Sequence, residues 1–133
     1  MNPPPLRFHV HHERLAIARL AADAEVPAWP GGGFVTITRT GDELSVVCAQ
    51  SFVPRDVRQE RERVALGIVG VIPMTTVGLL ASLCTALAAA KVPVFVISTF
   101  DTDWLLLQAE NFEAARKALE GLGHTVSGAL PQD

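Results

Sequence analysis

The chain alternates short apolar runs with short polar turns, and the spacing of the apolar positions changes half-way along. In the first half, Leu6–His11 and Arg14–Leu20 alternate apolar and polar residues, as half-buried strands do. Phe34–Arg39 and Leu44–Ala49 repeat this pattern on either side of Thr40–Glu43, whose glycine suits the tight turn of a hairpin. The first half is therefore predicted to be built from strands and turns.

A charged segment, Pro54–Glu62 (PRDVRQERE), divides the chain near its middle. Its composition predicts a solvated stretch. We interpret it as the boundary between an N-terminal half, residues 1–61, and a C-terminal domain, residues 62–128. A surface loop inside a single domain is the alternative interpretation.

The second half opens with an apolar run, Arg63–Val71, which predicts a strand that ends at Ile72-Pro73. The hydroxyl of Thr75 suits a helix cap, and a helix is expected over Thr76–Ala90, before Pro93. This helix is apolar nearly all round, so it must be covered on more than one side. The cover is expected from the other half of the chain or from a second subunit.

Two further strands are predicted at Val94–Ile97 and Trp104–Leu107, on either side of the polar insert Ser98–Asp103. An amphipathic helix follows at Asn111–Leu119, and His124–Val126 suits a last short strand. The order strand, helix, strand, strand, helix, strand is ferredoxin-like. We therefore expect an α+β fold with antiparallel sheets covered by helices.

Composition narrows the class of protein. The chain has 133 residues, of which 49% are hydrophobic and 19% charged, with a net charge of −3. These values are typical of a globular protein, and the absence of a basic patch argues against a nucleic-acid partner. Val64–Ala90 carries no charge, but Pro73 and Thr75–Gly78 interrupt it, so no membrane span is expected.

The expected location is the cytoplasm. The first residues are rich in proline where a secretory signal needs a continuous apolar run. Cys48 and Cys84 lie in apolar surroundings and are interpreted as buried free thiols, which fits a reducing compartment.

The polar insert also carries a resemblance to a known family. The segment Ile97–Asp103 (ISTFDTD) follows an alanine-rich helix, a short loop and a strand. With its surroundings, Ala86–Leu119, it resembles ACT domains of the family shared by small bacterial proteins and CASTOR-type cytosolic arginine sensors. Leu6–Leu20 and Phe34–Pro54 resemble the degenerate N-terminal ACT-like half of that family. The resemblance covers Leu6–Val126 and implies two ACT-like halves.

ACT domains are small regulatory modules that usually bind amino acids, and this family holds its ligand between two ACT units. The resemblance therefore implies a small-molecule ligand, an amino acid, held by two walls. Carried over by position, the first wall comprises Ile72, Pro73, Met74, Thr75, Thr76, Val77, Gly78 and Leu79. The second wall comprises Ser98, Thr99, Phe100, Asp101, Thr102 and Asp103. No cofactor is implied.

The residue types in these walls suit a zwitterion. The amides of Thr75–Val77, at the start of the expected helix, suit a carboxylate, and Gly78 lets the backbone come close to a ligand. Asp103 or Asp101 suits an ammonium group, and Phe100 can pack on the ligand side chain. The opposite orientation, with Asp103 meeting a basic side chain, remains open at this point.

One departure from the family pattern bears on the ligand. Arginine sensors of this type carry an acidic residue near the position of Thr76, whereas Val64–Val96 contains no acid. Arginine is therefore not the expected ligand. Each wall residue also has a simpler interpretation, since Asp101 and Asp103 suit a hairpin turn and Thr75 a helix cap.

Other functions have weaker support. His9, His11 and His12 raise the possibility of a metal site, but no acid or cysteine pattern completes one. No nucleophile motif or phosphate-binding loop is present, so an enzyme is not expected. We predict a regulatory or sensor protein that forms a homodimer. The alternative is a structural or protein-interaction module that binds no ligand.

Overall fold

The computed structural model describes residues 4–132, which divide into two compact units. The C-terminal unit comprises residues 4–12 and 64–131, and the N-terminal unit comprises residues 13–63 together with residue 132. Strand β5 (Gln59–Ile68) contributes its first residues to the N-terminal unit and its last five to the C-terminal unit.

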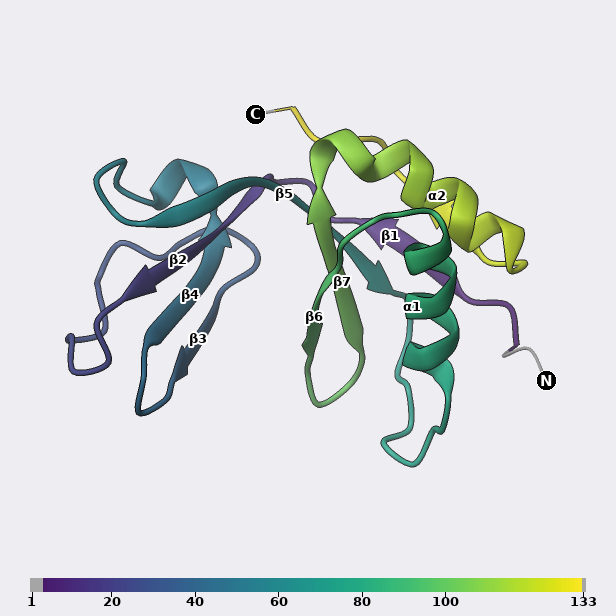
Figure 1. Cartoon of the computed structure of the whole chain (residues 1–133), viewed down its shortest axis with the longest axis horizontal. Coiled ribbons are helices and arrows are strands. Elements are labelled where there is room, and N and C mark those ends of the chain that lie inside the picture. The colour runs from purple at the N-terminus through teal and green to yellow at the C-terminus, as the bar shows by residue number, and fades with distance from the viewer. Residues whose placement is uncertain (1–3, 133) are drawn as a thin grey trace. The chain divides into compact units, whose positions relative to one another are not determined.

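The C-terminal unit has a five-stranded sheet in the order β6-β7-β5-β1-β8. Its elements are β1 (Arg7–Val10), β5, α1 (Leu79–Ala89), β6 (Phe95–Ser98), β7 (Asp103–Gln108), α2 (Phe112–Gly121) and β8 (Thr125–Ser127). A short 3-10 turn, η2 (Ala109–Asn111), leads into α2. From β5 onward, this is the expected ferredoxin-like order. Figure 1 shows α1 and α2 side by side on one face of the sheet.

Strand β1 is an addition to that order. It lies between β5 and β8, antiparallel to β5, with Phe8 opposite Ile68, and parallel to β8, with Phe8 opposite Val126. The sheet is therefore mixed, whereas antiparallel pairing was expected. The sequence analysis grouped residues 1–61 together, but residues 4–12 lie in the C-terminal unit because β1 hydrogen-bonds to both strands.

The N-terminal unit is an antiparallel sheet in the order β3-β4-β2-β5. Its elements are β2 (Leu15–Leu20), β3 (Thr36–Arg39), β4 (Leu44–Ala49), the 3-10 turn η1 (Gln50–Phe52) and the start of β5. The expected strands and the hairpin are confirmed here. The core of this unit contains Ala16, Ala18, Val46, Cys48 and Val53.

The charged segment Pro54–Glu62 is not a solvated loop throughout. Strand β5 begins at Gln59 and pairs with β2, where Gln59 lies opposite Ala18. Its charged side chains fit a strand because Glu60 is exposed and Glu62 accepts hydrogen bonds from Arg14 and Gln50. The expected start of this strand, Arg63, was therefore four residues late.

One apolar core joins the sheet of the C-terminal unit to both helices. Helix α1 contributes Leu79, Leu83 and Leu87, which recur at every fourth residue and so share one face. Helix α2 contributes Phe112, Ala115 and Leu119. The remaining core residues are Phe8, Val64, Leu66, Ile68, Val92, Leu105, Leu107 and Ala109.

Helix α1 begins later than the sequence predicts, and one of its faces is exposed although burial on more than one side was expected. It begins at Leu79, with Gly78 at the N-cap at φ 86°, and no side chain caps it. Thr75 is therefore not its cap, because the chain before it turns at Thr76, whose N–H donates to the Pro73 carbonyl at 3.0 Å. Within the described residues the face bearing Thr85 is exposed, and Cys84 is only partly buried.

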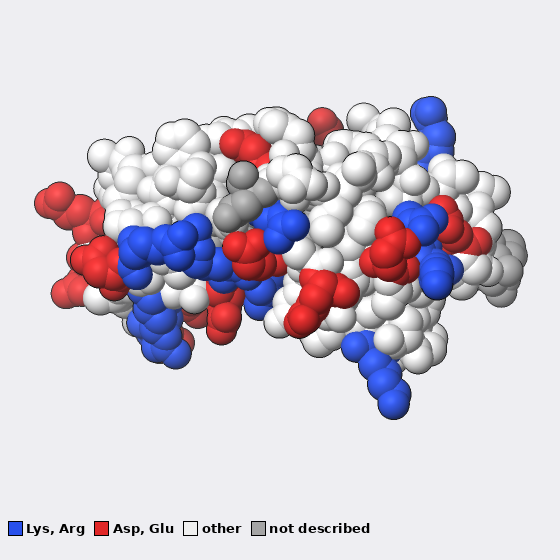
Figure 2. Space-filling view, turned by 90° about the horizontal axis from the view of Figure 1, so that it is seen from above, with Lys and Arg blue, Asp and Glu red and all other residues white. Residues whose placement is uncertain are grey.

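Two surface properties match the composition. None of the helices in residues 4–132 has the length and apolar character that crossing a membrane requires. On the face in Figure 2, acidic and basic side chains lie interspersed, with no broad area of one sign.

His124, which follows α2, is buried and forms a hydrogen bond to the backbone of Leu6. Its side chain is 2% exposed, and its Nδ1 accepts a hydrogen bond from the Leu6 N–H at 2.9 Å. The ring packs edge-on against Phe8, and Nε2 has no partner in the described structure. Burial lowers the pKa of this imidazole. Protonation would replace the Nδ1 acceptor with a donor that faces the Leu6 N–H.

We expect acid to destabilise the protein through His124. Because its pKa is lower folded than unfolded, the unfolded chain binds the proton more readily once pH falls below about 6.5. The free energy of unfolding then falls by up to ~1.4 kcal/mol per pH unit, until the pH reaches the lowered folded pKa. Urea unfolding of wild type and His124→Asn at pH 7.5 and 5.0 measures this. Equal pH dependence in both proteins would contradict it.

Candidate functional site

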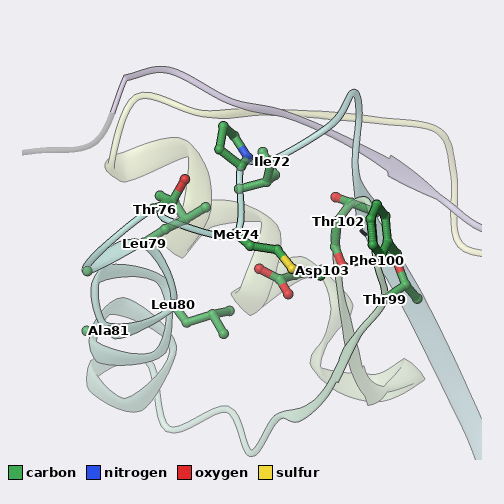
Figure 3. Close-up of a pocket in the computed structure, with 12 residues that line it drawn as sticks. Ile72, Met74, Thr76, Leu79, Leu80, Ala81, Thr99, Phe100, Thr102 and Asp103 are labelled. Carbon is green, nitrogen blue, oxygen red and sulfur yellow. Dashed lines mark hydrogen bonds between the residues drawn. The ribbon is translucent and has the colours of Figure 1, made fainter.

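A cavity of about 280 Å³ opens in the C-terminal unit, between α1 and the β6–β7 hairpin. Three segments form it: the loop that follows β5, the first turn of α1, and the hairpin tip. The lining residues are Ile72, Pro73, Met74, Thr76, Gly78, Leu79, Leu80, Ala81, Thr99, Phe100, Thr102 and Asp103. Figure 3 shows Leu80, Met74 and Asp103 directed into the space between α1 and the hairpin.

Hydrogen bonds hold the hairpin wall against the loop wall. The Ile72 N–H donates to the Asp101 carbonyl at 2.7 Å, which joins the two walls directly. The Thr102 hydroxyl donates to the Ile68 carbonyl at 3.1 Å, and the Thr99 N–H closes the turn on the Thr102 carbonyl at 2.8 Å. These bonds join the hairpin tip to the end of β5 and to Ile72, at the start of the loop.

Asp103 is the one charged residue among those that line the cavity. It starts β7 directly opposite Ser98 of β6, and the Ser98 hydroxyl donates to its Oδ1 at 2.6 Å. In Figure 3 its carboxylate points from the hairpin toward α1. The serine orients the carboxylate and leaves Oδ2 free of this bond, so the group is positioned to accept a cation.

The opposite side of the cavity is the N-terminus of α1. The first N–H groups of a helix have no partner within the helix, and here no side chain caps them. The first hydrogen bond of the helical i to i−4 pattern runs from the Ser82 N–H to the Gly78 carbonyl at 3.0 Å. The N–H groups of Leu79, Leu80 and Ala81 come before it and take no part in that pattern. Together with the helix dipole, such amides favour an anion.

The structure brings most of the predicted wall residues together. Those that line the cavity are Ile72, Pro73, Met74, Thr76, Gly78, Leu79, Thr99, Phe100, Thr102 and Asp103. Four others lie outside the lining: Thr75, Val77, Ser98 and Asp101. Of these, Ser98 and Asp101 bond to wall residues, whereas Val77 is 94% exposed.

Sequence reasoning missed Leu80 and Ala81, which line the cavity from the first turn of α1. It placed the helix start too early, so the amides of Thr75–Val77 were expected to be the donors. The four-residue spacing of Leu79, Leu83 and Leu87 indicates a helix that begins at Leu79, and glycine is an acceptable residue at the N-cap before it.

Comparisons with known proteins identify the family. Residues 60–121 match the model of the ACT domain, and residues 13–56 match that of an N-terminal domain. Protein Atu0741 from Agobacterium tumefaciens, known from its crystal structure, is 34% identical. That match covers 98% of this chain and 99% of the other, with a TM-score of 0.89. This chain belongs to the family of Atu0741. Its C-terminal unit holds an ACT domain, and the α+β, ferredoxin-like ACT fold is confirmed.

More distant structures share the ACT fold. An aspartate kinase from Clostridium acetobutylicum matches 92% of this chain at 13% identity and a TM-score of 0.68, and the match spans 35% of the kinase chain. The regulatory subunit of aspartate kinase from Thermus thermophilus matches 86% of this chain and 95% of that subunit, at 14% identity and a TM-score of 0.60. A search of curated proteins gave no match.

Proposed function

We propose that this protein is a regulatory amino-acid sensor and that the cavity between α1 and the β6–β7 hairpin is its ligand site. One observation carries the proposal. The carboxylate of Asp103 and the uncapped N-terminus of α1 line the same cavity. A free amino acid presents an ammonium and a carboxylate close together, and this cavity offers a complement to each.

The charges favour one orientation of the ligand. The ammonium lies at Asp103, and the carboxylate accepts hydrogen bonds from the amides at the start of α1. In the reverse orientation the ligand carboxylate meets the Asp103 carboxylate, and two like charges at close range repel. Thr75–Val77, which precede the helix, are not the donors in this scheme.

The proposed role is regulatory rather than catalytic, and cytoplasmic. The relatives that support it include a protein named as a regulatory subunit of aspartate kinase. A ligand that touches the loop before α1 and the hairpin at once stabilises one arrangement of these segments, which is how binding shifts a conformational equilibrium. The proposal includes two ACT-like halves and the relationship to CASTOR-type sensors that the segment Ile97–Asp103 indicates.

The proposal also includes a homodimer in which a second copy covers the mouth of the cavity. Large apolar side chains beside the mouth favour it, since Met74 is 72% and Phe100 82% exposed. Exposed apolar groups of this size are typical of surfaces that bind a partner or a ligand.

A thermal-shift screen of the twenty amino acids tests the proposed function. A ligand at about 100 times its Kd adds ~2.7 kcal/mol to the stability of the folded state, which raises Tm by several degrees. The N-acetyl derivative and the methyl ester of the best ligand each lack one charge, and neither is expected to raise Tm comparably. If no amino acid raises Tm at 10 mM (roughly 100 times a Kd of about 0.1 mM), the sensor proposal fails in favour of a module without ligand.

A further inference from the structure

We infer that the amino acid bound in this cavity has an uncharged aliphatic or thioether side chain of the size of leucine or methionine. This inference rests on the proposed function and names the class of ligand. Three features of the lining carry it: the number of charges, the state of the hydroxyls, and the position of the apolar side chains.

The cavity lining offers no second charged residue that could pair with a charged side chain of the ligand. Asp103 is the one charged residue in the lining, and the ligand ammonium uses it. A lysine or arginine side chain would compete for the same carboxylate, and an aspartate or glutamate side chain would face it. A charged group taken from water without a partner loses its hydration with nothing in return. Charged side chains are therefore disfavoured.

The hydroxyls of the hairpin wall are already used by the protein. The Thr99 hydroxyl donates to the Thr102 carbonyl at 3.2 Å, and the Thr102 hydroxyl donates to the Ile68 carbonyl at 3.1 Å. A hydroxyl has one proton, so neither can also donate to a ligand. A ligand side-chain oxygen that needs a donor, such as that of an amide, would find none in these two hydroxyls, which weakens its binding.

The apolar side chains that flank the cavity come from all three of its segments. Met74 lies on the loop and Phe100 on the hairpin tip, and Leu80 reaches in from α1 (Figure 3). An aliphatic ligand side chain placed among them removes apolar surface from water on every side. Methionine adapts its shape to such a partner. The volume of about 280 Å³ lies below the range for drug-sized ligands and suits a single amino acid.

Isothermal titration of the 133-residue chain with leucine, methionine, alanine, lysine and glutamate tests the inference. Each buried carbon group is worth about fourfold in Kd, and leucine has three more than alanine, so it should bind roughly 60-fold more tightly. Lysine and glutamate should bind no more tightly than alanine.

Two variants locate the specificity in the cavity. Phe100→Ala should weaken leucine binding about tenfold and change alanine binding less than threefold, since alanine is too short to reach the ring. The matched control is Val77→Ala, an exposed apolar residue of the loop before α1 that lies outside the lining. It should leave both affinities unchanged.

The outcomes separate the inference from the proposed function. If lysine or glutamate binds more tightly than leucine, or if leucine and alanine bind within twofold of each other, the inference is overturned and the sensor proposal stands. If none of the twenty amino acids binds, the sensor proposal falls and the inference falls with it. Equal effects of Phe100→Ala and Val77→Ala also overturn the inference.

Discussion

Replacing Asp103 with asparagine should weaken amino-acid binding by about 100-fold and leave the fold intact. Asparagine has the same shape and keeps a carbonyl oxygen that can accept the bond from the Ser98 hydroxyl at Oδ1. The substitution removes only the negative charge on which the ligand ammonium depends. Asp103 is only partly buried in the free protein, and a ligand seated in the cavity covers its carboxylate further. Loss of one member of a buried charge pair costs about 2–5 kcal/mol, so the lower part of that range applies, and ~2.7 kcal/mol corresponds to 100-fold in Kd.

The matched control is Asp101→Asn. Asp101 lies two residues away at the exposed tip of the same hairpin, and its side chain is not part of the lining. Its backbone carbonyl, which accepts the Ile72 N–H, is unchanged by the substitution. Titration calorimetry should find its Kd within twofold of wild type. A similar loss in both variants would indicate general electrostatic attraction, and an unchanged Kd in Asp103→Asn would contradict the assigned role.

The largest effect on stability is expected from Leu83→Ala. Leu83 is 0% exposed in the middle of α1 and packs into the core that joins both helices to the sheet. Removing its branched end leaves a cavity that the surrounding residues fill only in part, and such changes cost about 2–5 kcal/mol. The urea midpoint should fall accordingly, with an unchanged m-value.

Thr85→Ala on the exposed side of α1 is the control for this prediction. Its hydroxyl bonds only within the helix, to the Ala81 carbonyl at 2.7 Å, so its removal should change the free energy of unfolding by less than about 0.5 kcal/mol. If Leu83→Ala also cost less than ~1 kcal/mol, α1 would not be the core helix described above.

Local patterns were sufficient to predict most of the fold. The hairpin of β3 and β4 and the strands β2, β6 and β7 follow from alternating apolar positions and from glycine and proline between them. Helix α2 follows from its one-sided apolar face. These signals are local, since each lies within the element that it specifies.

Three features of the fold were not predicted from the sequence, because competing or distant interactions determine them. The insertion of β1 between β5 and β8 depends on pairing between segments more than 50 residues apart, and pairing has no local signature. The run of charges in Gln59–Arg63 predicted a solvated segment, whereas pairing with β2 makes it the start of strand β5. The hydroxyl of Thr75 suggested a helix cap, whereas the left-handed Gly78 stands at the N-cap of α1.

The candidate site could be predicted in outline but not in detail. The resemblance of Ile97–Asp103 supplied both walls, and the structure brings Asp103 and Thr76 to one cavity. The donors were assigned wrongly because they depend on the helix start. Leu80 was missed for the same reason, although its side chain bears on the class of ligand.

The central claim is that an amino acid binds between the N-terminus of α1 and Asp103. The most direct test is to titrate the ¹⁵N-labelled chain with the tightest-binding amino acid and to follow the backbone amide signals by NMR. The account predicts the largest shifts at Leu79, Leu80 and Ala81, together with the hairpin residues Thr99–Asp103. Saturating ligand that leaves these amides unmoved, or that moves a different region instead, would contradict it.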